Sequence, residues 1–349
     1  MSIRKIVLIG AFALFSILAL VGLLKKGKHE TPIAIKEARP AQEMVVQKRT
    51  ALPPPAPAAP IPIQPAPVAK TPPPVQKPPE FVKVEKENQP LPEANRIEEL
   101  FLIGSKNPAV ETVTYSSRVP WIKGRSAWLS DYATYYQTTR HFIARSLHHG
   151  PAYFSQTLNP GDRFNVFRKD RNIEFYLLID LSRTKLWLYL LDKDKGERLL
   201  LKTCSVGVGR KNAQKTSGCL TPTGKYLLGS KVAIYKPEVM GYFQDRKIEM
   251  IRVFGTRWIP FEKEVENCSE RAKGYGLHGA PWIEDTKTKA LVEDREQIGK
   301  YNSDGCIRLA QADIEEIFAI VISKPTLVEI VKDFYDAHLP GKEVEELSP

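Results

Sequence analysis

The chain has 349 residues, of which 42% are apolar and 26% charged, and its formal net charge is +11. Of the 28 prolines, 17 lie between Pro32 and Pro92, and residues 1–95 hold 13 Lys and Arg against 7 Asp and Glu. This uneven distribution excludes one compact fold over the whole length. It also argues against a nucleic-acid-binding protein, because the remaining residues are only mildly basic and lack a clear basic stripe.

The N-terminus carries an uncharged apolar run from Ile6 to Leu24, preceded by Arg4 and Lys5. As a helix it would span roughly 29 Å, close to the hydrocarbon thickness of a bilayer. The run meets Lys25 instead of a small-residue cleavage site, so we expect residues 1–30 to form an uncleaved signal anchor. We therefore expect a single-pass protein of the inner (cytoplasmic) membrane, with its long hydrophilic part in the periplasm or otherwise outside the cytoplasm.

Residues 31–95 are predicted to be a disordered, Pro-rich linker. Between Pro53 and Pro79 the chain alternates Pro and Ala with scattered Lys, a composition that favours extended polyproline II over helix or sheet. One interpretation is a semi-rigid spacer that reaches up to about 200 Å from a membrane. The other is a disordered tether of no particular length.

Residues 96–170 are predicted to form a small, mainly helical accessory region. Apolar and aromatic side chains recur at helical spacing from Trp128 to Leu147, with Ser126 as the candidate N-cap. The turn and alternating strand over 158–167 resemble the end of a LysM-type glycan-binding module. We interpret the aromatic residues as packing support, with a sugar-binding platform as the alternative.

The pattern becomes β from Ile173 onward, where two apolar runs separated by three polar residues indicate a hairpin. A helix with acidic residues in its first turn is expected over 313–322. Many strands and one packed helix predict a mostly β domain over 171–335, followed by a C-terminal tail over 336–349. The expected strands cover 173–181, 185–191, 199–208, 226–228, 251–254, 258–259 and 327–331.

Two polar residues flanked by glycine suggest covalent catalysis. Cys306 follows Gly305, and His278 lies between Leu277 and Gly279. A free thiol is mostly protonated at neutral pH, so a nucleophilic cysteine needs a base, and histidine is the natural one. A glycine before the cysteine lets a substrate carbonyl approach the backbone. Cysteine and histidine alone would also fit a buried thiol and a turn residue.

The surrounding motifs resemble the L,D-transpeptidase (YkuD-like) catalytic domain. The family's HG is His278-Gly279, its S-x-G-C-hydrophobic-Arg is Ser303 to Arg308, and its TPTG turn is Thr221 to Gly224. The resemblance covers about 173–332 and implies a β-sandwich or barrel-like fold with a packed helix. It implies no metal and no cofactor. His148 and His149, which lack clustered partner ligands, are expected to be a polar helix end.

The resemblance also implies residue roles. Cys306 would be the nucleophile and His278 the general base, while the N–H groups of Gly305 and Cys306 would hold the oxyanion. The remaining positions would shape the site or contact the substrate: Ser303, Asp304 and Gly279 in the first group, and Arg308 and Tyr275 in the second.

Two features depart from the family pattern. Asp304 stands where the family has a histidine, and an aspartate beside a thiol raises the thiol pKa unless it points away. The stretch between His278 and Cys306 is also longer than usual and carries charged runs at 284–285 and 293–296. We interpret this extension as a flap over the cleft or as a lineage-specific insertion.

The implied reaction is acyl transfer on peptidoglycan stem peptides through a Cys306 thioester, giving 3→3 cross-links. Water as the acceptor would give L,D-carboxypeptidase activity instead. The same residues would also fit a non-catalytic wall-binding module or a sortase-like transpeptidase. Three further cysteines, Cys204, Cys219 and Cys268, permit one disulfide outside the cytoplasm, and the first two are nearest in sequence.

Overall fold

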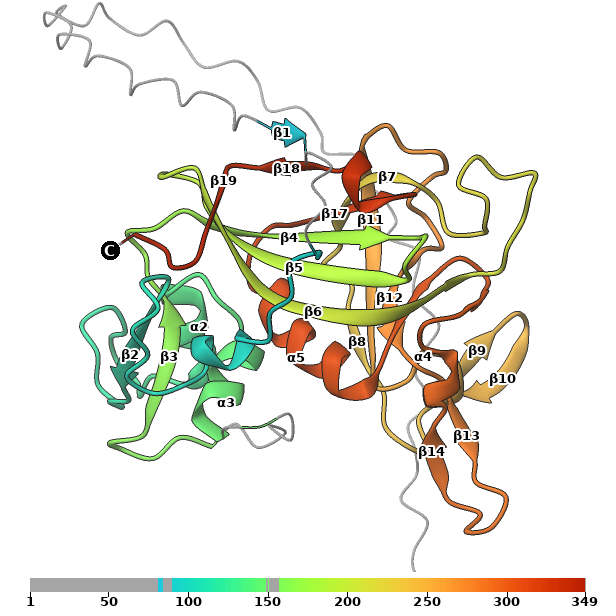
Figure 1. Cartoon of the computed structure of the whole chain (residues 1–349). Coiled ribbons are helices and arrows are strands. Elements are labelled where there is room, and N and C mark those ends of the chain that lie inside the picture. Colours follow the sequence, from blue (N-terminus) through green and yellow to red (C-terminus); the bar gives the residue numbers. More distant parts are fainter. Residues whose placement is uncertain (1–80, 84–89, 149, 151–156, 349) are drawn as a thin grey trace, which may run out of the picture. The chain divides into compact units, whose positions relative to one another are not determined.

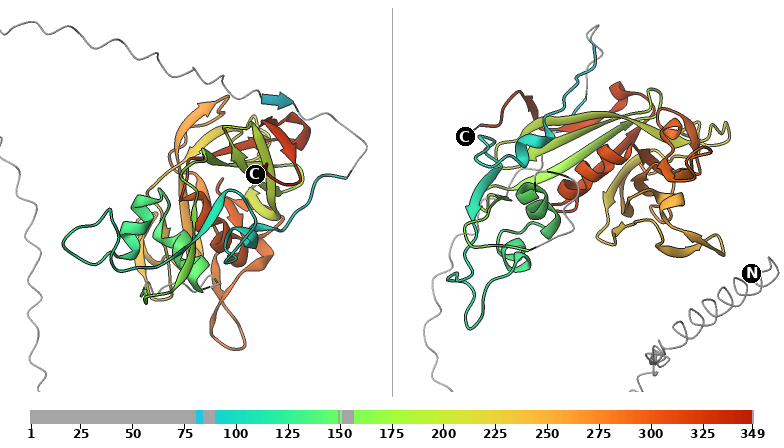
Figure 2. Two further views of the ribbon diagram at one scale, coloured as in Figure 1. Left: turned by 90° about the vertical axis from the view of Figure 1, so that its left-hand side faces the viewer. Right: turned by 90° about the horizontal axis from the view of Figure 1, so that it is seen from below.

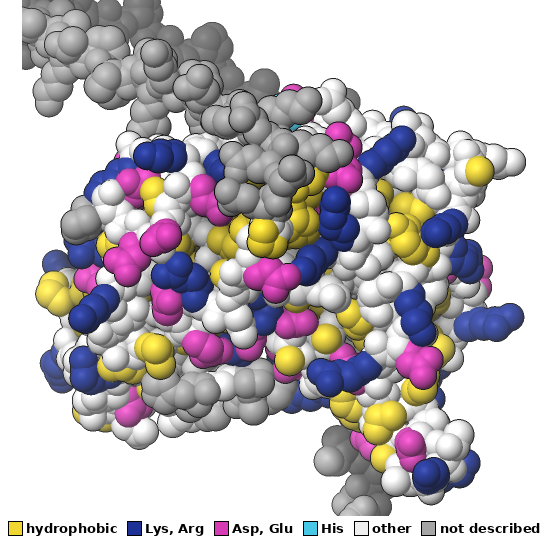
Figure 3. All heavy atoms as spheres, in the orientation of Figure 1, with side chains coloured by type: hydrophobic (Ala, Val, Ile, Leu, Met, Phe, Trp, Pro, Cys, Tyr) yellow, Lys and Arg dark blue, Asp and Glu magenta, His cyan; other side chains and the backbone are white. Residues whose placement is uncertain are grey.

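The computed structural model of the chain describes residues 81–83, 90–148, 150 and 157–348 (Figure 1). The expected signal anchor and most of the expected Pro-rich linker lie outside these residues. Within the described ranges, no helix is long and apolar enough to cross a bilayer. Figure 3 shows Lys and Arg side chains interspersed with acidic ones on one face of the molecule.

Eight strands close into a barrel in the order β12-β16-β6-β5-β4-β17-β7-β11, because β11 also pairs with β12. The pairs β12–β16 and β4–β17 are parallel and the other neighbours are antiparallel. This confirms the mostly β, barrel-like fold. The barrel strands are β4 (Ile173–Asp180), β5 (Lys185–Asp192), β6 (Glu197–Gly209), β7 (Gly224–Leu228), β11 (Arg257–Glu266), β12 (Gly276–Gly279), β16 (Ile307–Leu309) and β17 (Thr326–Val331).

The predicted hairpin is the β4–β5 pair, and its side chains serve two cores. Phe175, Leu177 and Ile179 of β4 lie in the main core cluster, whereas Tyr176 and Leu178 lie in a second cluster on the other face. Successive side chains of a strand point to opposite faces, so both faces of this hairpin are covered. That explains why its sequence is continuously apolar and does not alternate.

The predicted C-terminal helix is α5 (Gln311–Val321), with Asp313 in its first turn. It begins two residues after β16 and contacts β11 and β12. Ile314, Ile317 and Phe318 are fully buried in the main core cluster. The helix therefore supports the strands that carry the motif residues.

One predicted strand is wrong. Residues 251–254 form a one-turn helix, α4 (Ile251–Phe254), in which the N–H groups of Phe254 and Gly255 donate to the carbonyls of Met250 and Ile251 at 2.9 and 3.0 Å. A four-residue apolar run fits a strand and a helical turn equally well, so periodicity could not decide. Gly255 ends the turn at φ +58°, where a Cβ would lie 2.6 Å from the Ala280 carbonyl oxygen.

Further short elements decorate the barrel. A hairpin precedes α4, and an excursion between β12 and β16 contains a second hairpin near α4 (Figure 1). The remaining elements of this part are β8 (Ala233–Ile234), β9 (Met240–Phe243), β10 (Arg246–Glu249), β13 (Trp282–Glu284), β14 (Leu291–Glu293), η2 (Arg295–Gln297) and β15 (Tyr301–Ser303).

The accessory region is mixed α and β, not mainly helical as predicted. Its order is η1 (Ile97–Leu100), β2 (Val110–Thr114), α2 (Leu129–Tyr135), α3 (Arg140–His148) and β3 (Arg163–Phe167), with β2 and β3 antiparallel. Tyr115, Tyr132 and Phe164 are buried together in its own core, which supports the packing interpretation. The likeness to a glycan-binding module stays a prediction.

The single helical pattern of this region is in fact two helices. Gln137, at φ +51°, breaks the pattern between α2 and α3. The predicted N-cap is also wrong: α2 begins after Trp128, whose N–H donates to Asp131 Oδ2 at 2.7 Å, and Ser126 lies outside it. Because the aromatic spacing continues through the break, the pattern itself did not mark it.

The accessory region packs on the barrel through buried charges. Arg145 of α3, 2% exposed, donates to Glu98 at 2.6 Å, lies 3.7 Å from Glu316 of α5 and covers the Phe101 ring. Glu316 also pairs with the buried Lys202 of β6 at 2.8 Å. Figure 2 shows α5 between the sheet strands and the accessory helices, so this helix is held from both sides.

The expected domain boundaries shift at both ends of the folded part. Pro92 accepts a hydrogen bond from Trp187 Nε1 at 2.8 Å, and Arg96 N–H donates to the Leu201 carbonyl at 2.8 Å, so residues 92–95 belong to the fold and not to the linker. The expected tail contains η3 (Phe334–Asp336), β18 (His338–Pro340) and β19 (Lys342–Val344). β18 pairs with β1 (Phe81–Lys83), and β19 pairs with β6.

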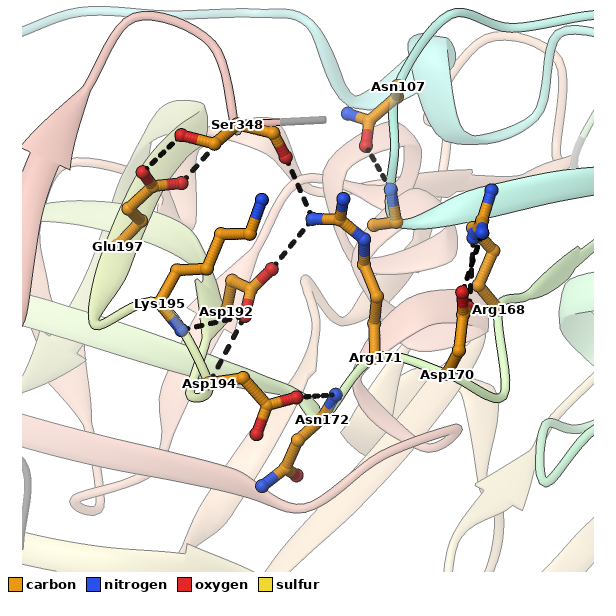
Figure 4. A network of polar contacts seen from close by, with 11 residues as sticks. Asn107, Arg168, Asp170, Arg171, Asn172, Asp192, Asp194, Lys195, Glu197 and Ser348 are labelled. Atoms are coloured by element: carbon orange, nitrogen blue, oxygen red, sulfur yellow. Dashed lines mark hydrogen bonds and ion pairs between the residues drawn. The ribbon is translucent and has the colours of Figure 1, made fainter. Parts of the chain in front are cut away.

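A polar network fastens the last residues (Figure 4). Arg171 donates to Asp192 at 2.8 Å and to the Ser348 carbonyl at 2.9 Å, and Ser348 N–H donates to Glu197 at 3.0 Å. Leu347 is 5% exposed and lies in the main core cluster. The C-terminal residues up to Ser348 are therefore packed and hydrogen-bonded as part of the folded domain.

We predict that Leu347→Ala lowers the free energy of unfolding by about 2–4 kcal/mol, because it leaves a cavity in the core. Leu102→Ala, at a side chain that is 54% exposed, should change it by less than about 0.5 kcal/mol. Urea unfolding of the full chain measures both. Equal, small effects would mean that residues 336–348 do behave as a tail.

Candidate active site

The site is organised by the parallel pairing of β12 with β16. His278 is in register with Arg308, and Leu277 with Ile307. Since side chains alternate along a strand, His278 and Arg308 share one face, whereas Leu277 and Ile307 enter the core. Cys306 lies directly before β16, two residues from Arg308, and the Arg308 charge acts on both Cys306 and His278. The three predicted site residues therefore lie around the β12–β16 pair.

The loop before Cys306 is held by two hydroxyl groups. Thr221 Oγ1 accepts from Gly209 N–H at 2.7 Å and donates to the Gly305 carbonyl at 2.9 Å. Ser303 Oγ accepts from Gly305 N–H at 3.1 Å and donates to the Cys306 carbonyl at 2.7 Å. Both side chains are almost fully buried. Cys306 therefore sits on a backbone segment that is fixed on both sides.

These hydrogen bonds engage one of the two expected oxyanion donors and leave the other available. The Gly305 N–H is engaged by Ser303, which differs from the expectation that it serves the oxyanion. The Gly305 carbonyl points to Thr221, and because the peptide is trans, the Cys306 N–H points the opposite way. Of these two donors, the Cys306 N–H is the one left to meet a developing oxyanion.

Gly305 is required at its position. Its φ of +121° is one that residues with a side chain rarely adopt, and a Cβ there would lie 2.5 Å from Tyr275 Cε1 and 2.8 Å from the Leu220 carbonyl oxygen. The predicted substrate-contacting Tyr275 therefore packs its ring on the backbone next to the nucleophile. Gly279 is close-packed as well, since a Cβ would meet Thr256 N at 3.1 Å.

His278 is oriented as a neutral base. Its Nδ1 lies 2.7 Å from the Gly279 carbonyl, which can only accept, so Nδ1 carries the proton and Nε2 keeps its lone pair. Phe254 and Trp258 flank the ring, with centroids at 5.3 and 5.9 Å. Burial lowers the pKa of His278 to about 4, and the nearby Arg308 charge adds to this, although the hydrogen bond to Gly279 opposes it.

Cys306 is half-buried, and its Sγ lies 3.7 Å from the Gly274 carbonyl. Burial raises the pKa of the Cys306 thiol to about 11. The Gly276 N–H and the Arg308 charge lower this pKa, but their effect is smaller than that of burial. Asp304 raises this pKa too, as its position suggested, but it is the smallest of these causes. The resting pair is therefore a neutral thiol and a neutral imidazole.

Arg308 is braced by the extension between β12 and β16. Its Nη1 donates to Gln297 Oε1 at 2.7 Å and to Asn302 Oδ1 at 3.2 Å, while its Nε is buried without a hydrogen-bond partner among the described residues. Burial lowers the pKa of the Arg308 guanidinium. A cation held in this way is suited to a substrate carboxylate.

The extension is anchored at its base. Gly207 of β6 allows this, since a Cβ there would lie 2.2 Å from the Gln297 carbonyl oxygen. Gly299 N–H donates to Val206, and Val208 N–H donates to Lys300, at 3.1 and 2.9 Å. Its β13–β14 hairpin lies next to α4 (Figure 1). The base of the extension therefore supports Arg308, a role that the flap and insertion hypotheses did not include.

Asp304 forms an ion pair at the surface. Its carboxylate lies 2.6 Å from Arg210 Nη2, and the two side chains are 63% and 62% exposed. Arg210 N–H donates to the Ser303 carbonyl at 2.9 Å, which ties the end of β6 to the cysteine loop. The charges of Asp304 and Arg210 both act on Arg308.

The sequence analysis missed several residues of this site. Thr221 belongs to the TPTG motif, which predicted a turn but not the bond to Gly305. Arg210, Gln297, Phe254 and Trp258 come from other segments, and no local pattern singles them out. All four cysteines, which lie in the described residues, are free, so the permitted disulfide between Cys204 and Cys219 does not form.

A cavity of about 420 Å³ lies away from Cys306 and does not include any predicted site residue. Its buried charges pair with each other: Lys225 lies 2.9 Å from Glu266, and Tyr176 donates to Glu329 at 2.7 Å. Lys225 and Glu329 of this cavity therefore have partners within the fold.

We predict that alkylation of Cys306 by iodoacetamide accelerates about tenfold per pH unit from about pH 6 to about pH 10, because only the thiolate reacts and its pKa is high. Mass mapping of the Cys306 peptide measures this rate. In the urea-unfolded protein the rate should level off above about pH 8.5. A plateau near neutral pH in the folded protein would show a stable thiolate and contradict the neutral resting pair.

The YkuD family model, which describes the L,D-transpeptidase catalytic domain, matches residues 174–330. A search of curated proteins finds no match. Among solved structures, Bd1075 from Bdellovibrio bacteriovorus is 15% identical with a TM-score of 0.30, over 46% of this chain and 48% of that chain.

The helical cell shape determining protein Pgp2 from Campylobacter jejuni is 18% identical with a TM-score of 0.29, over 46% of this chain and 49% of that chain. The chain thus spans about half the length of these solved chains. Residues 174–330, under half of the chain, are thus similar to the YkuD family of L,D-transpeptidase catalytic domains.

Proposed function

We propose that the chain is a cysteine-dependent L,D-transpeptidase that forms 3→3 cross-links in peptidoglycan. The observation that carries this proposal is the parallel register that sets His278 beside Arg308, two residues after Cys306. The family match supports the reaction class. The half-buried cation Arg308 supports a substrate that carries carboxylates, as peptidoglycan stem peptides do.

The first step is acylation. His278 Nε2 takes the proton of the Cys306 thiol as the sulfur attacks the carbonyl of the third stem residue, a diamino acid. The C–N bond to the terminal D-Ala breaks, and His278 returns the proton to the leaving amine. The Cys306 N–H meets the oxyanion of the tetrahedral intermediate. Because the resting pair is neutral, charge separates only when substrate is present.

The second step is transfer. The side-chain amine of another stem attacks the thioester carbonyl, and the C–S bond breaks. One amine proton passes through His278 to the departing sulfur, which regenerates the thiol. Water in place of the amine would release a tripeptide stem, the carboxypeptidase outcome. Both reactions use the same acyl-enzyme, so the acceptor alone separates them.

Intact-mass measurement after incubation with a carbapenem tests the nucleophile. We expect one covalent adduct on the full chain and none on Cys306→Ala. Digestion of purified peptidoglycan and mass analysis of the muropeptides then tests the reaction, with new 3→3 dimers expected. An adduct that survives Cys306→Ala would sink the assignment of the nucleophile, and tripeptide products without dimers would replace transpeptidation by carboxypeptidation.

We further propose that residues 1–30 anchor the protein in the inner membrane, with the catalytic domain in the periplasm. The support is the uncharged run from Ile6 to Leu24 and the proline-rich stretch behind it. We predict that the full chain stays with membranes after carbonate extraction and that added protease degrades the domain only once the outer barrier is opened. Recovery in the cytosolic fraction would contradict this.

A further inference from the structure

Asp304 lies where its carboxylate can influence the transfer of the acyl group from Cys306 to the acceptor. Asp304 directly precedes Gly305 and Cys306, and its carboxylate is 63% exposed. Its charge acts on the Cys306 thiol and on Arg308. It is therefore an accessible anion close to the sulfur that would carry the acyl group.

The counter-ion of Asp304 is replaceable. Arg210 holds the carboxylate at 2.6 Å, but the Arg210 side chain is itself 62% exposed. An ion pair that is this exposed to solvent contributes little to stability, so a second cation can take the place of the Arg210 guanidinium. The backbone of Arg210 stays fixed by its bond to the Ser303 carbonyl, so the exchange needs only side-chain movement.

The two possible acceptors differ in charge. An alkyl amine has a pKa near 10.4 and reaches the site as an ammonium ion, whereas water is neutral. Arg308, a cation whose charge acts on Cys306, would repel that ammonium. An anion beside Cys306 offsets this repulsion for the amine and does nothing for water.

We propose that Asp304 binds the side-chain ammonium of the acceptor stem in exchange for Arg210, and thereby directs the acyl-enzyme toward cross-linking and away from hydrolysis. This rests on the proposed function and names the residue that selects the acceptor. The bound ammonium first gives one proton to solvent and becomes the amine that attacks the thioester. When the amide forms and the C–S bond breaks, a second proton passes through His278 to the Cys306 sulfur.

The test compares three variants of the full chain: Asp304→Asn, Arg210→Gln and Asp170→Asn. Asp170 pairs with Arg168 at 2.6 Å in the accessory region, with a side chain that is 64% exposed, so it is a matched exposed ion pair away from the site. Each protein receives a tetrapeptide-stem donor and a tripeptide-stem acceptor. The readout is the ratio of cross-linked dimer to hydrolysed donor, beside the rate of carbapenem acylation.

We expect Asp304→Asn to lower this ratio about fivefold, the scale of one exposed charge–charge contact. Both products come from the same acyl-enzyme, so the ratio reports the choice of acceptor separately from the rate of acylation. Arg210→Gln should raise the ratio, because it frees the carboxylate, and Asp170→Asn should leave it unchanged. Added salt should lower the ratio in the wild type but not in Asp304→Asn.

Three results would overturn the inference. If Asp304→Asn and Arg210→Gln lower the ratio equally, Asp304 acts only by holding Arg210. If Asp304→Asn slows acylation and leaves the ratio unchanged, it does not select the acceptor. A wild type that acylates but forms no dimer removes the role of Asp304 alone, whereas a wild type that fails to acylate removes the proposed function as well.

Discussion

The site depends on one pairing, the parallel alignment of β12 with β16 that completes the barrel. Its register places His278 opposite Arg308 and leaves Cys306 at the entry of the next strand. A shift of one residue in either strand would turn the site side chain of that strand from this face into the core. Two other features hold the register: α5 contacts β12, and Thr221 holds the Gly305 carbonyl. The chemistry thus relies on backbone geometry more than on contacts between the catalytic side chains.

The surroundings of this pairing explain why the site is neutral at rest. Phe254 and Trp258 exclude water from the His278 ring, and the Gly279 carbonyl fixes its tautomer. The same burial raises the pKa of the Cys306 thiol. A neutral pair avoids the desolvation cost of a buried ion pair before substrate arrives. It also keeps the thiol protonated and so less open to oxidation.

The sequence predicted what local patterns encode. The continuous apolar runs of β4 and β5 and the acidic first turn of α5 were recognised, and the motifs located Cys306, His278 and their neighbours. The failures have physical causes. The run 251–254 is too short for periodicity to separate a helical turn from a strand. The Thr221–Gly305 bond and the Arg210–Asp304 pair join residues more than eighty positions apart, and only the closed barrel brings them together.

The buried side chain of Arg145 has a consequence for how such proteins can diversify. Arg145 links α3 to α5. Residues 92–95 and β19 also contact the barrel, although they lie outside the family-matched segment. A recombination event that moved residues 174–330 alone would expose faces of β5 and β6 that are now covered and would remove Arg145 from Glu316. The unit that folds as one piece is therefore larger than the family-matched segment.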